Sequence, residues 1–143
     1  MTKRLFATTP DSQERAFLIG VKRESDDRQK ALESLKELER LTESAGARVK
    51  DKTLQELKRI DPAFFIGRGK AQDIQEAISS HDINLAVFDE DLSPAQQRNL
   101  EHIFGAKVID RTALILDIFA QRAKSREGKL QKNLPSLPIF SPA

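Results

Sequence analysis

Residues 85–109, LAVFDEDLSPAQQRNLEHIFGAKVI, decide the fold, because they predict a strand, a helix and a second strand in direct succession. Leu85–Phe88 is a short unbroken apolar run, which is typical of a strand buried on both faces. The helix is predicted to begin with a capping box that pairs Ser93 with Gln96, three residues later. Apolar residues at helical spacing give this helix its buried face: Leu100, Ile103 and Phe104. A glycine then ends the helix, and Lys107–Ile109 forms the last strand.

The same alternation extends toward the N-terminus. Arg15–Val21 is a further apolar strand, and the helix after it is predicted to start at Ser25 with an acidic first turn. The buried stripe of that helix is predicted from its apolar residues: Ala31, Leu32, Leu35, Leu38, Leu41 and Ala45. Residues 47–58 mix apolar and charged side chains, as edge strands do. Strands that alternate with amphipathic helices predict an α/β fold with a mostly parallel sheet of about four strands, flanked by helices.

The sequence divides into four parts. We expect residues 1–14 to form a flexible lead-in, residues 15–110 the α/β domain, residues 111–131 a long basic amphipathic helix, and residues 132–143 a proline-rich tail. Charged residues are 32% and apolar residues 38% of the chain, the balance of a soluble globular protein. There is no cysteine, no signal peptide and no apolar run of the roughly 20 residues that cross a bilayer, so we expect a cytoplasmic protein without membrane contact.

The predicted last helix lies within residues 108–131, VIDRTALILDIFAQRAKSREGKLQ, and is apolar first and basic later. Its predicted buried face comprises the following residues: Leu114, Ile115, Ile118, Phe119 and Ala123, with Asp117, Gln121 and Lys124 opposite. Its second half supplies the candidate RNA-binding cations: Arg122, Lys124, Arg126 and Lys129. Two interpretations stay open. These side chains are either solvated cations near a helix C-terminus, or a local patch that binds RNA phosphates.

Gly67-Arg68-Gly69-Lys70 is a candidate phosphate-binding turn at the start of another predicted helix. It is not a Walker motif, because Phe64 stands where the first glycine is needed and Ala71 where a magnesium-binding serine or threonine is needed. Two glycines beside two cations would nevertheless suit a phosphate group of RNA or of a nucleotide. The simpler interpretation is a tight turn into the helix.

Asp89, Glu90 and Asp91 follow a predicted parallel strand, where such sheets place their ligands and where carboxylates can hold magnesium. The simpler explanation is that acidic residues are favoured ahead of a helix start. We find no serine with an evident base, no paired catalytic carboxylates and no histidine with a second metal ligand at useful spacing. The residues therefore indicate a binding module without a metal site, and not an enzyme.

Three stretches of the chain resemble the N-terminal portion of the HflX family of translational GTPases. They are residues 65–74, FIGRGKAQDI, residues 87–101, VFDEDLSPAQQRNLE, and residues 108–131. The resemblance runs from about Arg15 to Gln131. It implies a parallel-sheet subdomain followed by two long antiparallel helices and a GTPase domain. It also implies a cytoplasmic protein that binds the large ribosomal subunit and helps to split or rescue stalled ribosomes, with its helical hairpin near ribosomal RNA.

By this resemblance, the basic residues between Arg122 and Lys129 belong to the first hairpin helix and contact ribosomal RNA. After Gln131 the sequence departs from the family and ends in KNLPSLPIFSPA. It contains no G-x-x-x-x-G-K-[ST], D-x-x-G or N-K-x-D motif. We therefore expect a truncated family member that has no cofactor of its own, since GTP and magnesium belong to the GTPase domain.

Two alternatives stay open beside ribosome binding. The chain could be a nucleotide-binding domain that uses Gly67–Lys70 together with Asp89 or Asp91. It could also be an interaction remnant that self-associates through its last helix. Without a second hairpin helix, that helix would expose apolar side chains: Phe119, Ala123 and Leu130.

Overall fold

The computed structural model describes residues 13–133, and side chains within residues 13–124, so most of the predicted lead-in and tail lies outside the described residues. Strands and helices alternate along the chain: β1 (Arg15–Arg23), α1 (Arg28–Ser44), β2 (Arg48–Leu57), α2 (Arg68–Ser80), β3 (Leu85–Phe88), α3 (Pro94–Phe104), β4 (Lys107–Asp110) and α4 (Arg111–Asn133). The strands form one parallel sheet in the order β2-β1-β3-β4, with β2 at an edge as predicted. The predicted α/β fold with a long C-terminal helix is confirmed.

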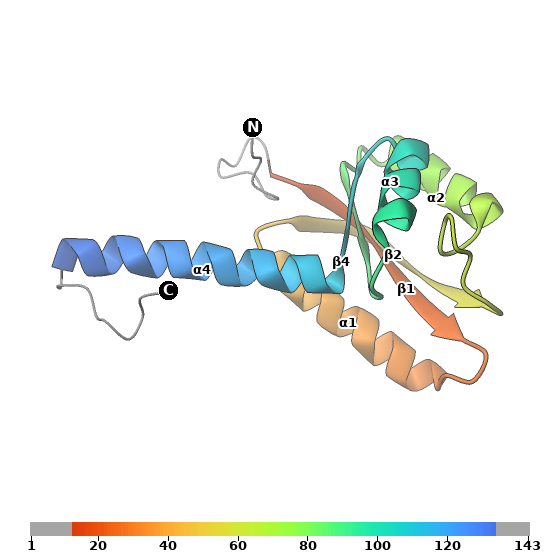
Figure 1. Ribbon diagram of the computed structural model, residues 1–143, viewed down its shortest axis with the longest axis horizontal. Coiled ribbons are helices and arrows are strands. Elements are labelled where there is room, and N and C mark those ends of the chain that lie inside the picture. The colour runs from red at the N-terminus through yellow and green to blue at the C-terminus, as the bar shows by residue number, and fades with distance from the viewer. Residues whose placement is uncertain (1–12, 134–143) are drawn as a thin grey trace.

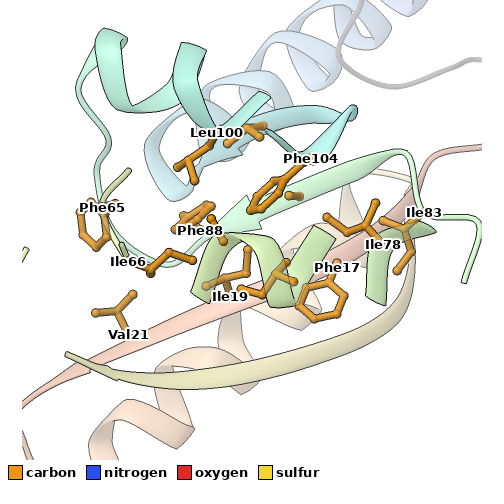
Figure 2. Close-up of a cluster of buried hydrophobic side chains, with 14 of the residues drawn as sticks. Phe17, Ile19, Val21, Phe65, Ile66, Ile78, Ile83, Phe88, Leu100 and Phe104 are labelled. Atoms are coloured by element: carbon orange, nitrogen blue, oxygen red, sulfur yellow. The ribbon is translucent and has the colours of Figure 1, made fainter. Parts of the chain in front are cut away.

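Each face of the sheet is covered by two helices. Successive residues of a strand point to opposite faces, so they belong to different apolar clusters. Phe17, Ile19 and Phe88 belong to the apolar cluster under α2 and α3, whereas Leu18 and Val87 belong to the cluster under α1 and α4. Figure 2 shows the first cluster, in which the ring of Phe88 lies 6.0 Å from that of Phe65 and 6.5 Å from that of Phe104. Burial on both faces explains why β1 and β3 are apolar without alternation.

Two helix starts test the capping predictions. The capping box at α3 is confirmed, since Ser93 Oγ accepts from the backbone N–H of Gln96 at 3.1 Å and the Gln96 side chain accepts from Ser93 N at 2.8 Å. The predicted cap at Ser25 is wrong. α1 starts at Arg28, and Asp27 caps it by accepting from Gln29 N at 3.1 Å. Asp26 instead accepts from the backbone N–H of Arg23, which places Ser25 in the turn before the helix.

α4 leaves the carboxyl end of β4 and extends well past the sheet (Figure 1). Leu114 and Ile118 are buried against the sheet and α1, as predicted. Ile115, also on the predicted face, is half-buried. The prediction is wrong for Phe119, which is 61% exposed, and for Ala123, which is exposed as well. Gln121 was predicted on the opposite face, but it points toward α1, where its amide donates to Ala45 O at 3.4 Å. The reason is that, within the described residues, α4 packs chiefly on α1, β3 and β4, so only a narrow stripe of the helix is covered.

Candidate functional site

The base of α4 is held by Arg111, the first residue of the helix. Its Nε donates to Asp89 Oδ1 at 2.7 Å, and its Nη2 donates to the backbone oxygen and to the hydroxyl of Ser34, each at 3.0 Å. The Asp89 carboxylate is 6% exposed and also accepts from Ser34 Oγ at 2.7 Å. One guanidinium therefore ties α4 to the end of β3 and to α1.

The strand register explains why these residues meet. Phe88 of β3 lies opposite Asp110 of β4, so the next residues of the two parallel strands, Asp89 and Arg111, leave the sheet side by side. Asp110 caps the new helix, because its Oδ1 accepts from Ala113 N at 3.0 Å while its Oδ2 accepts from Leu92 N at 3.0 Å. Thr112 Oγ1 adds a hydrogen bond to Asp91 Oδ1 at 2.8 Å.

The candidate RNA-binding cations lie beyond this base. Arg122 and Lys124 are exposed, and neither forms a hydrogen bond or an ion pair with any described side chain. The backbones of Arg126 and Lys129 continue α4, but their side chains lie outside what the structure describes. The described part of the cationic segment is thus open to solvent on a helix that projects from the domain (Figure 1).

In the candidate phosphate-binding turn, unlike in the distal half of α4, the cations have partners within the protein. Gly67 is the N-cap of α2 at φ 89°, a conformation that glycine adopts readily. The ammonium of Lys70 donates to the backbone oxygen of Glu56 at 2.6 Å, and the guanidinium of Arg68 lies 5.8 Å from the ring centre of Phe64. Both cations therefore have partners within the protein: Lys70 ties the start of α2 to β2, and Arg68 stacks on the preceding loop.

That loop is itself fixed to α3. Asp61 and Phe65 form a backbone bridge with hydrogen bonds of 2.9 Å in both directions. The side chains of Gln96 and Asn99 donate to Asp61 O at 2.9 Å and to Ala63 O at 3.0 Å. The glycine turn therefore does not follow a strand directly; it ends a loop whose backbone is held in place on both sides.

The three acidic residues after β3 each have a partner within the protein. Asp89 pairs with Arg111 and Asp91 accepts from Thr112, while Glu90 lies 3.4 Å from the guanidinium of Arg23. Burial raises the pKa of the Glu90 carboxyl; Arg23 lowers it, and the nearby aspartates raise it further. In the part of the chain that the structure describes, no three His, Cys, Asp or Glu side chains are arranged to hold a metal ion.

A hollow of about 230 Å³ opens beside this run, between β1, α1 and the end of β3. Four carboxylates and one ammonium are among the groups that line it: Asp26, Asp27, Asp89, Glu90 and Lys30. Because carboxylates repel phosphate, this lining does not favour a nucleotide.

Sequence reasoning missed the contact of Arg111 with Asp89 and Ser34, which anchors the base of α4. A signal existed, because an arginine directly after a predicted strand and an aspartate directly after its neighbour can meet in a parallel sheet. It could be used only once β3 and β4 were known to be adjacent and in register.

The sequence and the fold are matched by known proteins. The profile of the family described as GTP-binding GTPase N-terminal matches residues 32–120, which is more than half of the chain. The chain belongs to this family, the N-terminal domains of HflX-type GTPases.

Individual relatives agree. The GTPase HflX of Lacrimispora saccharolytica is 46% identical over 125 residues, a match that covers 87% of this chain and 29% of the relative. The GTPase HflX of Escherichia coli is 45% identical over 127 residues, with 89% and 29% covered. The crystal structure of the SsGBP–GDP complex superposes with a TM-score of 0.59 at 28% identity, over 83% of this chain and 32% of that one. The chain thus spans about 29% of the length of these curated relatives.

Within the described residues, no helix combines the length and the apolar character that spanning a membrane requires.

Proposed function

We propose that this chain is a non-catalytic docking module of an HflX-type GTPase, which binds ribosomal RNA of the large ribosomal subunit in the cytoplasm. The contact is made by the basic half of α4: Arg122, Lys124, Arg126 and Lys129. GTP hydrolysis in the relatives named GTPase HflX, and the splitting or rescue of stalled ribosomes, then depend on parts of those proteins outside the matched region.

The proposal rests on a contrast along α4: the first residue of the helix is bonded within the domain, whereas the described cations further along have no partner. Arg111 has carboxylate and carbonyl partners on two other elements, whereas Arg122 and Lys124 have none among the described side chains. Because the described tertiary contacts of α4 end at Gln121, Arg122 and Lys124 meet a partner without first breaking a described ion pair. Phosphate is the natural partner, because lysine and arginine bind RNA largely by displacing its counterions.

Co-sedimentation with purified large ribosomal subunits, at a series of salt concentrations, tests the proposal. We expect the chain to pellet at low salt, and the double variant Arg122→Gln/Lys124→Gln to bind more weakly. Its plot of log affinity against log salt should be shallower by about 1–2, since each lost phosphate contact removes roughly 0.7–0.9 from the slope.

The matched control is Arg48→Gln/Lys50→Gln, which removes the same charge from exposed positions of the edge strand β2. This control should bind like the unaltered chain. Failure of the folded chain to pellet even at low salt, or an equal loss in the control, would contradict the proposal.

A further inference from the structure

The outer edge of β2 lies at the opposite side of the sheet from β4, and among the described residues no strand covers it. Lys50 has no register partner in β1, which marks a bulge in the first half of β2. The bulge and the charges around it protect that half against strand pairing, as on many edge strands. Thr53–Leu57 is regular, and an edge strand of this kind presents main-chain N–H and C=O groups that point away from its neighbour. The second half of β2 can therefore accept a further strand.

A hollow of about 260 Å³ opens beside this edge, between α1 and Lys52 of β2. Leu32 and Leu35 of α1 line it, and Leu32 is 36% exposed, one of the three large apolar side chains that are exposed among the described residues. The polar lining residues are Gln29, Glu33, Lys36 and Lys52. Alternate side chains of a strand point to the same face, so a strand added to β2 would direct every second side chain toward α1. The hollow can then hold one apolar side chain of that strand.

Positive charge flanks the edge at both ends of β2. Four exposed cations, whose side chains have no partner among the described residues, stand at the start of the strand and directly after its end: Arg48, Lys50, Lys58 and Arg59. The carboxylates of β2 are already engaged, because Glu56 pairs with Arg28 at 3.2 Å and Asp51 accepts from the backbone N–H of Lys52 at 2.8 Å. The two ends of the edge are therefore suited to negative charge on a partner.

We infer that the outer edge of β2 binds an extended segment of a partner protein, with an apolar residue near its centre and acidic residues toward both ends. The main chain of the segment adds a strand to the sheet, and its apolar side chain enters the hollow beside Leu32. Peptides that add to sheet edges are recognised in this way, by main-chain hydrogen bonds together with a pocket for alternate side chains. Lys50 and Lys58 are eight residues apart, about 26 Å in a strand, so a segment of about nine residues spans them.

Charge argues against other occupants of this edge. A second copy that paired β2 with β2 would bring cations together in either direction: Arg48 beside Lys58 or Arg59 in an antiparallel pair, and each cation beside its own copy in a parallel pair. Residues 1–12 of this chain carry two cations and one carboxylate, and residues 134–143 carry three prolines, which lack the N–H that pairing needs. The inference does not depend on the proposed RNA contact, because β2 and α4 share no residue.

Selection from two displayed nonapeptide libraries tests the inference. One library has the form DEXXXXXED and the other the form KKXXXXXKK, where X is randomised. We expect the full chain to enrich peptides from the acidic library alone, with an apolar residue near the centre and few prolines. Fluorescence anisotropy then gives the affinity of an enriched peptide. Leu32→Asp should weaken binding by about tenfold or more, because it places a carboxylate where the apolar side chain is buried. Leu116→Asp is the matched control on α4, where the leucine is also exposed, and should change nothing.

Charge reversal tests the ends of the edge. Lys58→Glu/Arg59→Glu should weaken binding of the acidic peptide and strengthen binding of the same peptide with lysines at its ends. Arg122→Glu/Lys124→Glu makes the same charge change on α4 and should leave the peptide affinity unaltered. All four side chains are exposed, so the fold should be kept, and circular dichroism checks this.

Amide hydrogen exchange, followed by NMR, tests main-chain pairing. The N–H groups of residues 53–57 that point away from β1 should exchange quickly in the free chain, and the bound peptide should slow them by about tenfold or more. Recovery of no binder from the acidic library, or equal recovery from both libraries, overturns the inference. A peptide that binds without slowing exchange at residues 53–57, or that tolerates Leu32→Asp, overturns it too. Loss of ribosome co-sedimentation in Lys58→Glu/Arg59→Glu, without any peptide binding to the unaltered chain, would assign the edge to RNA instead.

Discussion

Arg111 and Asp89 form the closest ion pair between α4 and the sheet, with 2.7 Å between Nε and Oδ1. The two residues stand directly after neighbouring parallel strands, and the hydroxyl of Ser34 completes the contact from α1. Together with the buried Leu114 and Ile118, this pair sets the direction in which α4 leaves the domain, because it fixes the first turn of a helix whose distal half has no described tertiary contact. The direction in which the distal cations point therefore depends in part on a contact about three to five helical turns away.

Replacement of Arg111 by methionine should lower the free energy of unfolding by about 2–4 kcal/mol, since it leaves the nearly buried Asp89 carboxylate without a counter-charge. Urea unfolding followed by circular dichroism measures this. Arg23→Gln is the control, because the Arg23–Glu90 pair is longer, at 3.4 Å, and more exposed. It should cost less than about 1 kcal/mol. An equal decrease in the free energy of unfolding in the two variants would show that the Arg111–Asp89 pair stabilises the fold no more than the Arg23–Glu90 pair does.

Glu90 gives a prediction for pH. Burial raises the pKa of its carboxyl above the ordinary value of 4.5, although Arg23 acts in the opposite direction. The folded protein then binds this proton more tightly than the unfolded chain does, so Glu90 favours folding below pH 4.5, and this contribution is lost as the pH rises through the folded pKa. Glu90→Gln should therefore gain stability relative to the unaltered chain as the pH rises through this window.

Urea midpoints at a series of pH values measure that difference, and carbon-detected NMR of the Glu90 carboxyl measures the pKa directly. Arg23→Gln should move the pKa of Glu90 further upward, because it removes the charge that lowers it. A downward movement, or a Glu90→Gln variant with unchanged pH dependence, would contradict this account.

The capping box of α3 gives a local test. Ser93→Ala removes the acceptor of the Gln96 N–H and should cost about 1 kcal/mol in unfolding free energy, as N-cap losses typically do. Ser79→Ala is the matched control at an exposed position of α2, where the hydroxyl accepts only from the Gln75 amide. It should change the urea midpoint little. A similar cost at both serines would mean that capping is not what Ser93 contributes.

Sequence reasoning predicted the features of this fold that short-range chemistry determines. The apolar runs of β1 and β3 and the Ser93–Gln96 box each depend on residues within a few positions of one another. The start of α1 was missed because Ser25, Asp26 and Asp27 are all good caps in a row. Only the turn after β1, in which Asp26 bonds to Arg23, leaves Asp27 as the cap.

Features that depend on neighbours distant in the chain could not be predicted in the same way. Periodicity shows that α4 has an apolar face, but its contact with α1 decides that Gln121 turns inward and Phe119 outward. The Arg111–Asp89 pair depends on the register of β3 and β4. Whether the cations from Arg122 to Lys129 bind RNA depends on a partner, and stays a prediction.

Replacement of Lys70 tests whether residues 67–70 form a structural turn or a nucleotide-binding site. Its ammonium donates to Glu56 O at 2.6 Å, so Lys70→Met should lower the unfolding free energy by about 1 kcal/mol, while Arg68→Gln should cost less because its partner is only the Phe64 ring. Calorimetry with ATP or GTP and magnesium should show no binding to the unaltered chain, since Lys70 already has a partner and the hollow beside Asp89 is acidic. A nucleotide affinity that Lys70→Met abolishes without changing the urea midpoint would assign the lysine to phosphate instead.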